Sequence, residues 1–127
     1  MGILIKSFGG EGYSVVVESG SWKIAIMNYA ERFDRLRPIE LEKHFHTDEC
    51  FVLLQGEAEL LTLTGDDLKD AETQIKKTSL LLNTVYCVEK GTWHHIWASG
   101  DAKVAVIENR DTSMANTVRH RLKGANA

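Results

Sequence analysis

The sequence predicts an all-β protein, folded as a single barrel or sandwich. Short segments of alternating apolar residues follow one another along the chain, separated by turns that contain glycine. No segment has the apolar period of a long amphipathic helix, and no repeat of 20–50 residues occurs. The chain has 127 residues, of which 43% are hydrophobic, so its size and composition are those of one ordinary globular domain.

The first half of the chain contains two predicted pairs of strands. Residues 13–18 and 22–29 alternate as strands do, and Ser19-Gly20-Ser21 forms a tight hairpin connection between them. A charged, turn-like stretch follows. The second pair covers residues 50–55 and 57–64, with only Gly56 between them.

The second half begins with a polar excursion over residues 66–77, which we expect to include an edge strand near residues 73–77. Three further strands are predicted, and the chain after Asp111 is expected to be a polar tail of the single domain 1–127. The apolar runs at 51–54 and 80–82 are nearly continuous, which is typical of strands buried on both faces. The three strands are residues 80–88, 94–98 and 103–109.

Composition excludes several classes of partner. The formal net charge of -3 argues against electrostatic binding to nucleic acid or to an anionic membrane. No leader peptide and no apolar run of membrane-spanning length is present, which predicts a cytoplasmic protein. Cys50 and Cys87 lie in apolar strand-like runs and are predicted to be reduced core thiols. Residues 3–8 and 13–18 can pair across a two-fold axis, so we expect a homodimer.

Histidines form the most informative cluster of the sequence. In His44-Phe45-His46 the spacing of two places both imidazoles on one face of a strand, because strand side chains alternate. Glu49 follows after a Thr47-Asp48 turn, and His94 comes from a distant strand. Three imidazoles and a carboxylate are a ligand set for a first-row divalent metal. His95 is expected on the opposite face of its strand.

These residues carry a resemblance to a known family. Glu49-x6-Gly56 fits the end of the first motif of the cupin superfamily, G-x5-H-x-H-x(3,4)-E-x6-G, and Gly91-x2-His94 fits part of the second. Residues 88–95 (VEKGTWHH) are similar to the form that the second motif takes in small cupins related to ureidoglycolate lyase. The resemblance implies a single-domain cupin-type β-barrel (a double-stranded β-helix or jelly roll). It also implies a site for a divalent metal such as Mn, Fe, Ni or Zn.

The spacing of the first motif leaves two alignments open. Only two residues separate His46 from Glu49, one fewer than the motif allows. In the first alignment His44 and His46 both bind metal and the turn is shortened. In the second, His44 binds, Glu42 or no residue takes the other position, and His46 lies in a loop. His44, Glu49 and His94 are ligands in both.

The candidate substrate contacts are Glu42 and three aromatic residues on the same predicted strands. Phe51, Trp93 and Trp97 either pack in the core or line a small-molecule pocket. An unliganded Glu42 or His46 is a candidate for moving protons.

Two functions follow from the resemblance. The first is a divalent-metal-dependent enzyme acting on a small polar metabolite, since cupins include isomerases, epimerases, dioxygenases, decarboxylases and lyases. The second is a non-catalytic cupin that binds or senses a ligand with little or no metal. The departures from the second motif favour the latter, because Glu89 replaces its proline and Ala98 its asparagine.

Overall fold

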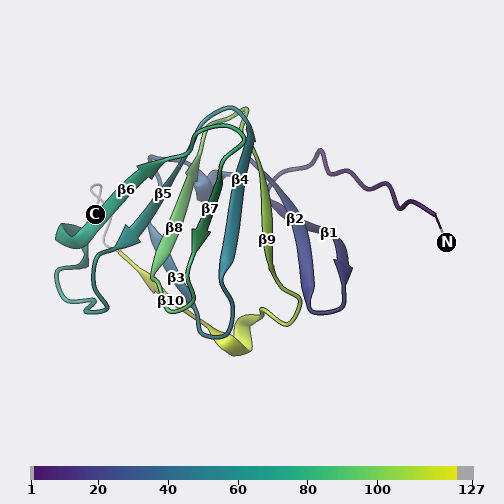
Figure 1. Ribbon diagram of the computed structural model, residues 1–127. Helices are drawn as coiled ribbons and strands as arrows, with labels where there is room; N and C mark the ends of the chain where they lie inside the picture. The colour runs from purple at the N-terminus through teal and green to yellow at the C-terminus, as the bar shows by residue number, and fades with distance from the viewer. Residues whose placement is uncertain (1, 123–127) are drawn as a thin grey trace.

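The chain forms two five-stranded antiparallel sheets that face each other as a barrel (Figure 1). The structure is a computed structural model and describes residues 2–122. One sheet has the strand order β1-β2-β9-β4-β7 and the other β10-β3-β8-β5-β6. The strands are β1 (Tyr13–Ser19), β2 (Trp22–Asn28), β3 (Glu40–His44), β4 (Glu49–Gln55), β5 (Ala58–Leu63), β6 (Ile75–Ser79), β7 (Val85–Val88), β8 (His94–Ala98), β9 (Lys103–Asn109) and β10 (Thr117–Arg121).

Three short 3-10 helices connect the strands: η1 (Glu31–Phe33), η2 (Ala71–Gln74) and η3 (Met114–Asn116). Within residues 2–122, no helix reaches the length and hydropathy that crossing a bilayer requires. The all-β fold class predicted from the sequence is confirmed, and most of the predicted strands are present.

Alternation along the strands fills the barrel interior. Leu53 of β4 and Val104 of β9 are paired across the sheet and both are buried. Phe51 and Val106 form the next inward pair. Inward residues of β2, β5 and β8 complete one core cluster, which is the expected result of burying one face of each strand.

Gly56 is required where β4 turns into β5. Its φ angle is +73°, and a Cβ atom there would lie 2.8 Å from Ala102 Cα and 2.7 Å from Asp101 Oδ1. Positive φ and close backbone approach both favour glycine. The Gly56 of the sequence motif therefore closes the end of the barrel opposite Glu49.

The two sheets differ in how their outer faces are covered. The outer face of the sheet containing β3 is covered by a second cluster, in which Leu41 and Trp93 pack against Leu63, Ala71 and Leu122. Residues that precede and follow η2 contribute to this cover. The polar excursion at 66–77 thus shields one sheet with the chain's own residues.

The outer face of the other sheet is apolar and has no such cover in the described part of the chain. Two rows of neighbouring side chains run across its central strands and end at β7. The rows are Ile24, Ile107, Cys50 and Cys87, and Ile26, Ala105, Val52 and Val85. Both cysteines are free thiols, as predicted. The prediction that they lie in the core is wrong, because Cys50 is half-buried and Cys87 is exposed.

Two expectations about chain segments are wrong. Residues 80–82 do not form a strand buried on both faces, since Leu81 and Leu82 are 68% and 54% exposed. Asn83 has a positive φ angle and interrupts the run before the edge strand β7. The stretch after Asp111 is not a free polar tail, because β10 pairs with β3 along five residues.

Candidate metal centre

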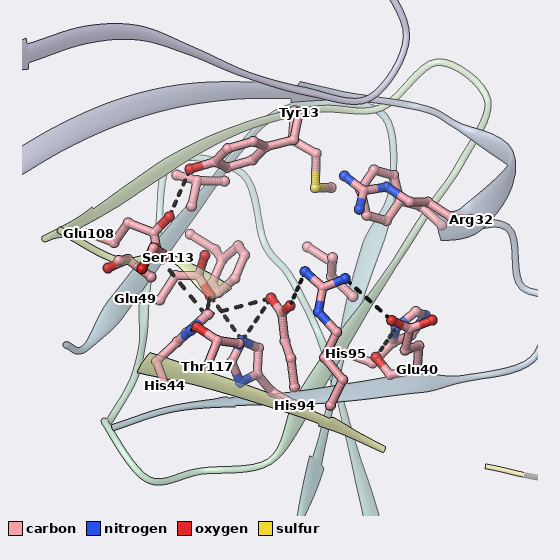
Figure 2. A pocket seen from close by; sticks show the side chains of 18 of the residues that line it. Tyr13, Arg32, Glu40, His44, Glu49, His94, His95, Glu108, Ser113 and Thr117 are labelled. Atoms are coloured by element: carbon pink, nitrogen blue, oxygen red, sulfur yellow. Dashed lines mark hydrogen bonds and ion pairs between the residues drawn. The ribbon is translucent and has the colours of Figure 1, made fainter. Parts of the chain in front are cut away.

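The barrel has a cavity of about 300 Å³ at the end where Glu49 begins β4 and Glu108 lies near the end of β9. Figure 2 shows the polar side chains that line it. Inward positions on β3, β4, β8 and β9 supply ionisable groups here, whereas the inward rows of β4, β8 and β9 become apolar toward Gly56.

Four of these side chains meet at one point. Glu42, His44, Glu49 and His94 each place a ligand atom within 4.8 Å of the others. Glu49 Oε1 lies 3.2 Å from His44 Nε2 and 2.9 Å from His94 Nε2. Glu42 Oε1 lies 3.5 Å and 3.8 Å from the same two nitrogens. The group therefore consists of two imidazoles and two carboxylates.

Strand geometry explains why these four residues meet. Glu42 and His44 are two residues apart on β3, so they face the same side. Glu42 is paired with His94 of β8, which brings the second histidine beside the first. Glu49 begins β4 in the opposite sheet and approaches both histidines from across the cavity.

Each histidine is oriented through its other ring nitrogen. His44 Nδ1 lies 2.8 Å from Thr117 Oγ1 of β10, and His94 Nδ1 lies 2.9 Å from the carbonyl oxygen of Thr92. Both rings consequently turn Nε2 toward Glu49. Such contacts fix ring orientation and tautomer in metal sites.

The electrostatics of the group couple its acids and bases. Burial opposes ionisation of Glu49, but hydrogen bonds from His44 and His94 prevail and lower its pKa to about 2. Burial likewise opposes a charge on His44, but hydrogen bonds to Glu42 and Glu49 raise its pKa to about 10. The pKa of His94 is raised as well, where burial is outweighed by its hydrogen bond to Glu49. The histidines thus hold protons that a metal ion would displace.

The donor set fits a divalent metal. Imidazole nitrogen and carboxylate oxygen together suit zinc, iron, manganese and nickel. The two carboxylates of the cluster can balance the two positive charges of a divalent ion. The cluster can therefore hold a divalent metal ion, with Glu42, His44, Glu49 and His94 as its ligands.

His46 lies outside this group. Strand β3 ends at His44, so the alternation that placed both imidazoles on one face stops before His46. Its side chain is exposed, and its carbonyl oxygen accepts a hydrogen bond from Asn109 Nδ2. The arrangement corresponds to the alignment in which Glu42 takes the second position and His46 lies in a loop.

Three other residues in or next to β8, Trp93, His95 and Trp97, face away from the metal group. His95 lies half-buried at the rim, with Nδ1 3.2 Å from the carbonyl oxygen of Glu40, and burial lowers its pKa. Trp93 packs in the second cluster and does not line the cavity. Trp97 is on the outer face, where Arg35 stacks on its ring at 4.0 Å. Of the predicted substrate contacts, Glu42 and Phe51 line the cavity, and Trp93 and Trp97 do not.

Sequence reasoning missed a second polar group in the cavity. The Tyr13 hydroxyl donates to Glu108 Oε1 at 2.7 Å, and Lys23 Nζ lies 3.8 Å from the same oxygen. Glu108 Oε2 is buried without a hydrogen-bond partner among the described residues and lies 4.0 Å from His44 Nε2. Burial and the charge of Glu49 raise the pKa of Glu108 to about 7. The sequence signal for this group is that Glu108 continues the alternating inward row of Val104 and Val106, so a carboxylate stands where an apolar core residue is expected.

Comparisons with known proteins show the fold. No family model and no curated protein matches the sequence. Solved structures do match, among them a cupin-2 domain containing protein from Shewanella frigidimarina, which is 20% identical. The match covers 81% of this chain and 85% of that one, with a TM-score of 0.53.

The chain has the cupin fold. Two further cupin-fold matches are similar over most of this chain. Pac13, described as a nucleoside dehydratase, is 8% identical over 92% of this chain and 85% of its own, with a TM-score of 0.61. The iron(II) form of HppE is 15% identical over 76% of this chain and 48% of its own, with a TM-score of 0.55.

Proposed function

We propose that this cupin is a divalent-metal-dependent enzyme that acts on a small polar metabolite in the cavity. The observation that carries the proposal is the convergence of four ligand atoms within 4.8 Å, on Glu42, His44, Glu49 and His94, at the wall of the cavity. The structural likeness to HppE, whose solved form contains iron(II), supports a metal at such a site.

A bound metal would supply Lewis-acid or redox activation to a substrate oxygen. The protein's own contribution is positioning and proton transfer. Thr117 and Thr92 hold the two imidazoles in place. Glu108 lines the cavity, and one of its oxygens is buried without a partner among the described residues, while Tyr13 and Lys23 hold the other, so Glu108 is the candidate proton acceptor.

The test is elemental analysis of untagged protein after incubation with Mn, Fe, Ni and Zn, followed by removal of free metal. We expect about one metal ion per chain in the native protein. His44→Ala should retain little metal, because removing one ligand lowers the affinity by at least about 100-fold. His46→Ala is the matched control, because His46 is exposed two residues away and we expect it to retain the metal. Equal metal content in the native and His44→Ala proteins would refute the proposed ligand set.

A non-catalytic binding module is the second candidate function. The observation that favours it is that the histidines and carboxylates already pair with each other at 2.9–3.5 Å. Such pairs satisfy the buried charges without an ion. If no metal binds under any loading condition, Glu42, His44, Glu49 and His94 are contacts for a polar ligand.

We further propose that the protein is a homodimer, built through its N-terminal arm, residues 2–10. The arm extends away from the barrel (Figure 1), and its Ile3 and Ile5 are 89% and 88% exposed. Asn28 Nδ2 donates to the carbonyl oxygens of Phe8 and Gly10 and fixes the direction in which the arm leaves. An apolar arm held away from its own barrel is suited to a second copy.

The partner's surface in this proposal is the uncovered apolar face of the sheet containing β2, β9 and β4. Its two rows contain no charged side chain, and Val85 at its edge is exposed. Residues 2–8 of the arm, when extended, span about 23 Å, enough to cross several strands of the partner. The same face is available on both copies, as a two-fold dimer requires.

Light scattering across a concentration series tests the dimer. We expect twice the chain mass of 14.3 kDa for the native protein and the chain mass for Ile5→Asp. Leu36→Asp is the control, since Leu36 is 77% exposed but belongs neither to the arm nor to the two apolar rows. A native protein that stays monomeric at all concentrations would reject the dimer.

A further inference from the structure

Arg32 lines the cavity and has no carboxylate within ion-pair distance among residues 2–122. Its guanidinium lies over the ring of Phe33, with Cζ 4.5 Å from the ring centroid. Phe33 is buried and belongs to the main core cluster, so it is a fixed platform. The stacking leaves the edge of the guanidinium, with its hydrogen-bond donors, free.

The turn that carries Arg32 is itself held in place. The backbone N–H of Phe33 donates to the carbonyl oxygen of Ala30 at 2.9 Å, which closes η1. The Tyr29 hydroxyl donates to Asp34 Oδ2 at 2.6 Å across the same turn. Arg32 is therefore presented from an ordered backbone.

The other two long cations of the cavity are already neutralised. Lys23 Nζ donates to the carbonyl oxygen of Thr112 at 3.0 Å and lies 3.8 Å from Glu108. Arg119 lies 3.4 Å from Glu40 and 3.5 Å from Glu42. Arg32 is thus the cavity's one lysine or arginine, in the described chain, that has no counter-charge.

The metal group and Arg32 lie at opposite sides of the cavity. Figure 2 shows the Arg32 side chain across the open space from His44 and Glu49. The lining also has an apolar part, contributed by Met27, Phe33, Phe51, Ile96 and Val106. A ligand that reaches both sides needs a negative group for Arg32, an oxygen for the metal group and a short apolar part beside these side chains.

We infer that Arg32 is the binding site for a carboxylate of the substrate, so that the substrate is a small organic acid with a second oxygen donor. This rests on the proposed function for the role of that second oxygen. A guanidinium binds carboxylate through two parallel hydrogen bonds. One unpaired guanidinium balances the single charge of a carboxylate, whereas a phosphate monoester carries up to two and would face the cavity's other carboxylates.

The experiment is titration calorimetry on the metal-loaded full chain with small acids and their amides. The probes are glycolate, 3-hydroxypropanoate, 4-hydroxybutanoate and succinate, which vary the distance between a carboxylate and a second oxygen. Each is compared with its amide, and inorganic phosphate is titrated as a separate arm. The variants are Arg32→Gln and, as a matched control, Arg35→Gln. Arg35 also stacks on an aromatic ring, that of Trp97, but lines a separate hollow with Trp97 and Lys77 instead of the cavity.

The expected result is that at least one acid binds the native protein about 10- to 100-fold more tightly than its amide. Arg32→Gln should lose that preference, and Arg35→Gln should keep it, with the metal content equal in all three proteins. The inference is overturned if no acid binds, if Arg32→Gln binds acids as the native protein does, or if phosphate binds more tightly than every acid.

The metal-free protein separates this inference from the proposed function. If the chain takes up no metal but still binds an acid through Arg32, the carboxylate site stands and the metal-dependent function fails. If metal is bound stoichiometrically and acids show no preference over amides, the metal site stands and the Arg32 site is refuted.

Discussion

The two ends of the barrel interior are built by the same strands but differ in chemistry. Near Gly56, the inward positions of β4 and β9 are Leu53 and Val104, which are almost fully buried. Four residues along the same strands, the inward pair is Glu49 and Glu108. Phe51 and Val106 lie between them and mark the boundary, since they belong to the core cluster and also line the cavity.

This contrast separates what folds the barrel from what equips the site. Apolar side chains at the closed end contribute burial without unsatisfied polar atoms. The open end instead holds four carboxyl and imidazole groups, three of them buried, that stabilise one another in pairs, together with a carboxyl whose second oxygen has no partner in residues 2–122. Buried ionisable groups of this kind add little net stability and are typical of functional sites. Substitutions at the two ends should therefore change different measurements.

The largest expected effect on stability is at the closed end. Leu53→Ala should lower the free energy of unfolding by about 3 kcal/mol, because it leaves a cavity among well-packed neighbours. Chemical denaturation followed by circular dichroism measures this change. Metal content per folded chain should stay the same, and a variant that loses metal while keeping its stability would contradict the separation of the two ends.

An intermediate effect is expected behind the metal group. Thr117→Val keeps the shape of the side chain but removes the hydroxyl that lies 2.8 Å from His44 Nδ1. Without that contact the ring loses its fixed orientation, so metal affinity should fall about tenfold. Competition with a metal-binding indicator dye measures the affinity. An unchanged affinity would show that Thr117 does not position His44.

The smallest effect is expected at Glu108, and its sign is opposite to that of Leu53→Ala. The pKa of Glu108 in the folded protein is about 7, raised above its ordinary 4.5, so the folded state resists its ionisation. Between pH 4.5 and pH 7 the Glu108 carboxyl is ionised in the unfolded chain but still protonated in the folded protein, so the free energy of unfolding falls as the pH rises. Above pH 7 the carboxyl is ionised in both states, and this loss of stability is complete. Glu108→Gln should thus be more stable than the native protein at pH 8, by on the order of 1 kcal/mol.

That difference should shrink as the pH falls from 7 and disappear well below pH 4.5, where the native carboxyl is protonated in both states. Thermal or urea unfolding in chelator at several pH values provides the measurement. A variant that is less stable than the native protein at pH 8 would mean that the Glu108 carboxylate stabilises the fold.

Much of the fold was predictable because apolar alternation directly reflects burial. Residues 94–98 and 103–109 match β8 and β9 as predicted. Strand β10 (Thr117–Arg121) was not predicted, because its side chains are mostly polar. It depends on pairing with β3, and the contacting residues His44 and Thr117 are 73 residues apart in the sequence. No local pattern encodes a pairing at that distance.

The site was predictable only where a motif fixes spacing. His44, Glu49 and His94 were identified in both alignments, and Glu42 in one of them. Grouping His46 with them requires that the strand continues, but β3 ends at His44, two residues before His46. Arg32 was not identified because it enters the cavity from a 3-10 turn, where neither alternation nor helical period predicts direction. The similarity of residues 88–95 to ureidoglycolate lyase relatives stays a prediction.

The contact between Thr117 and His44 also bears on how the protein matures. A nascent chain exposes Glu42, His44, Glu49 and His94 to the cell before residue 117 has left the ribosome, and until then His44 has no hydroxyl to orient it. Arg119, which lies 3.5 Å from Glu42, arrives later still. In the proposed metal-dependent enzyme, full metal affinity is consequently expected only once β10 has joined the sheet, so that tight loading with an ion would accompany a completed barrel.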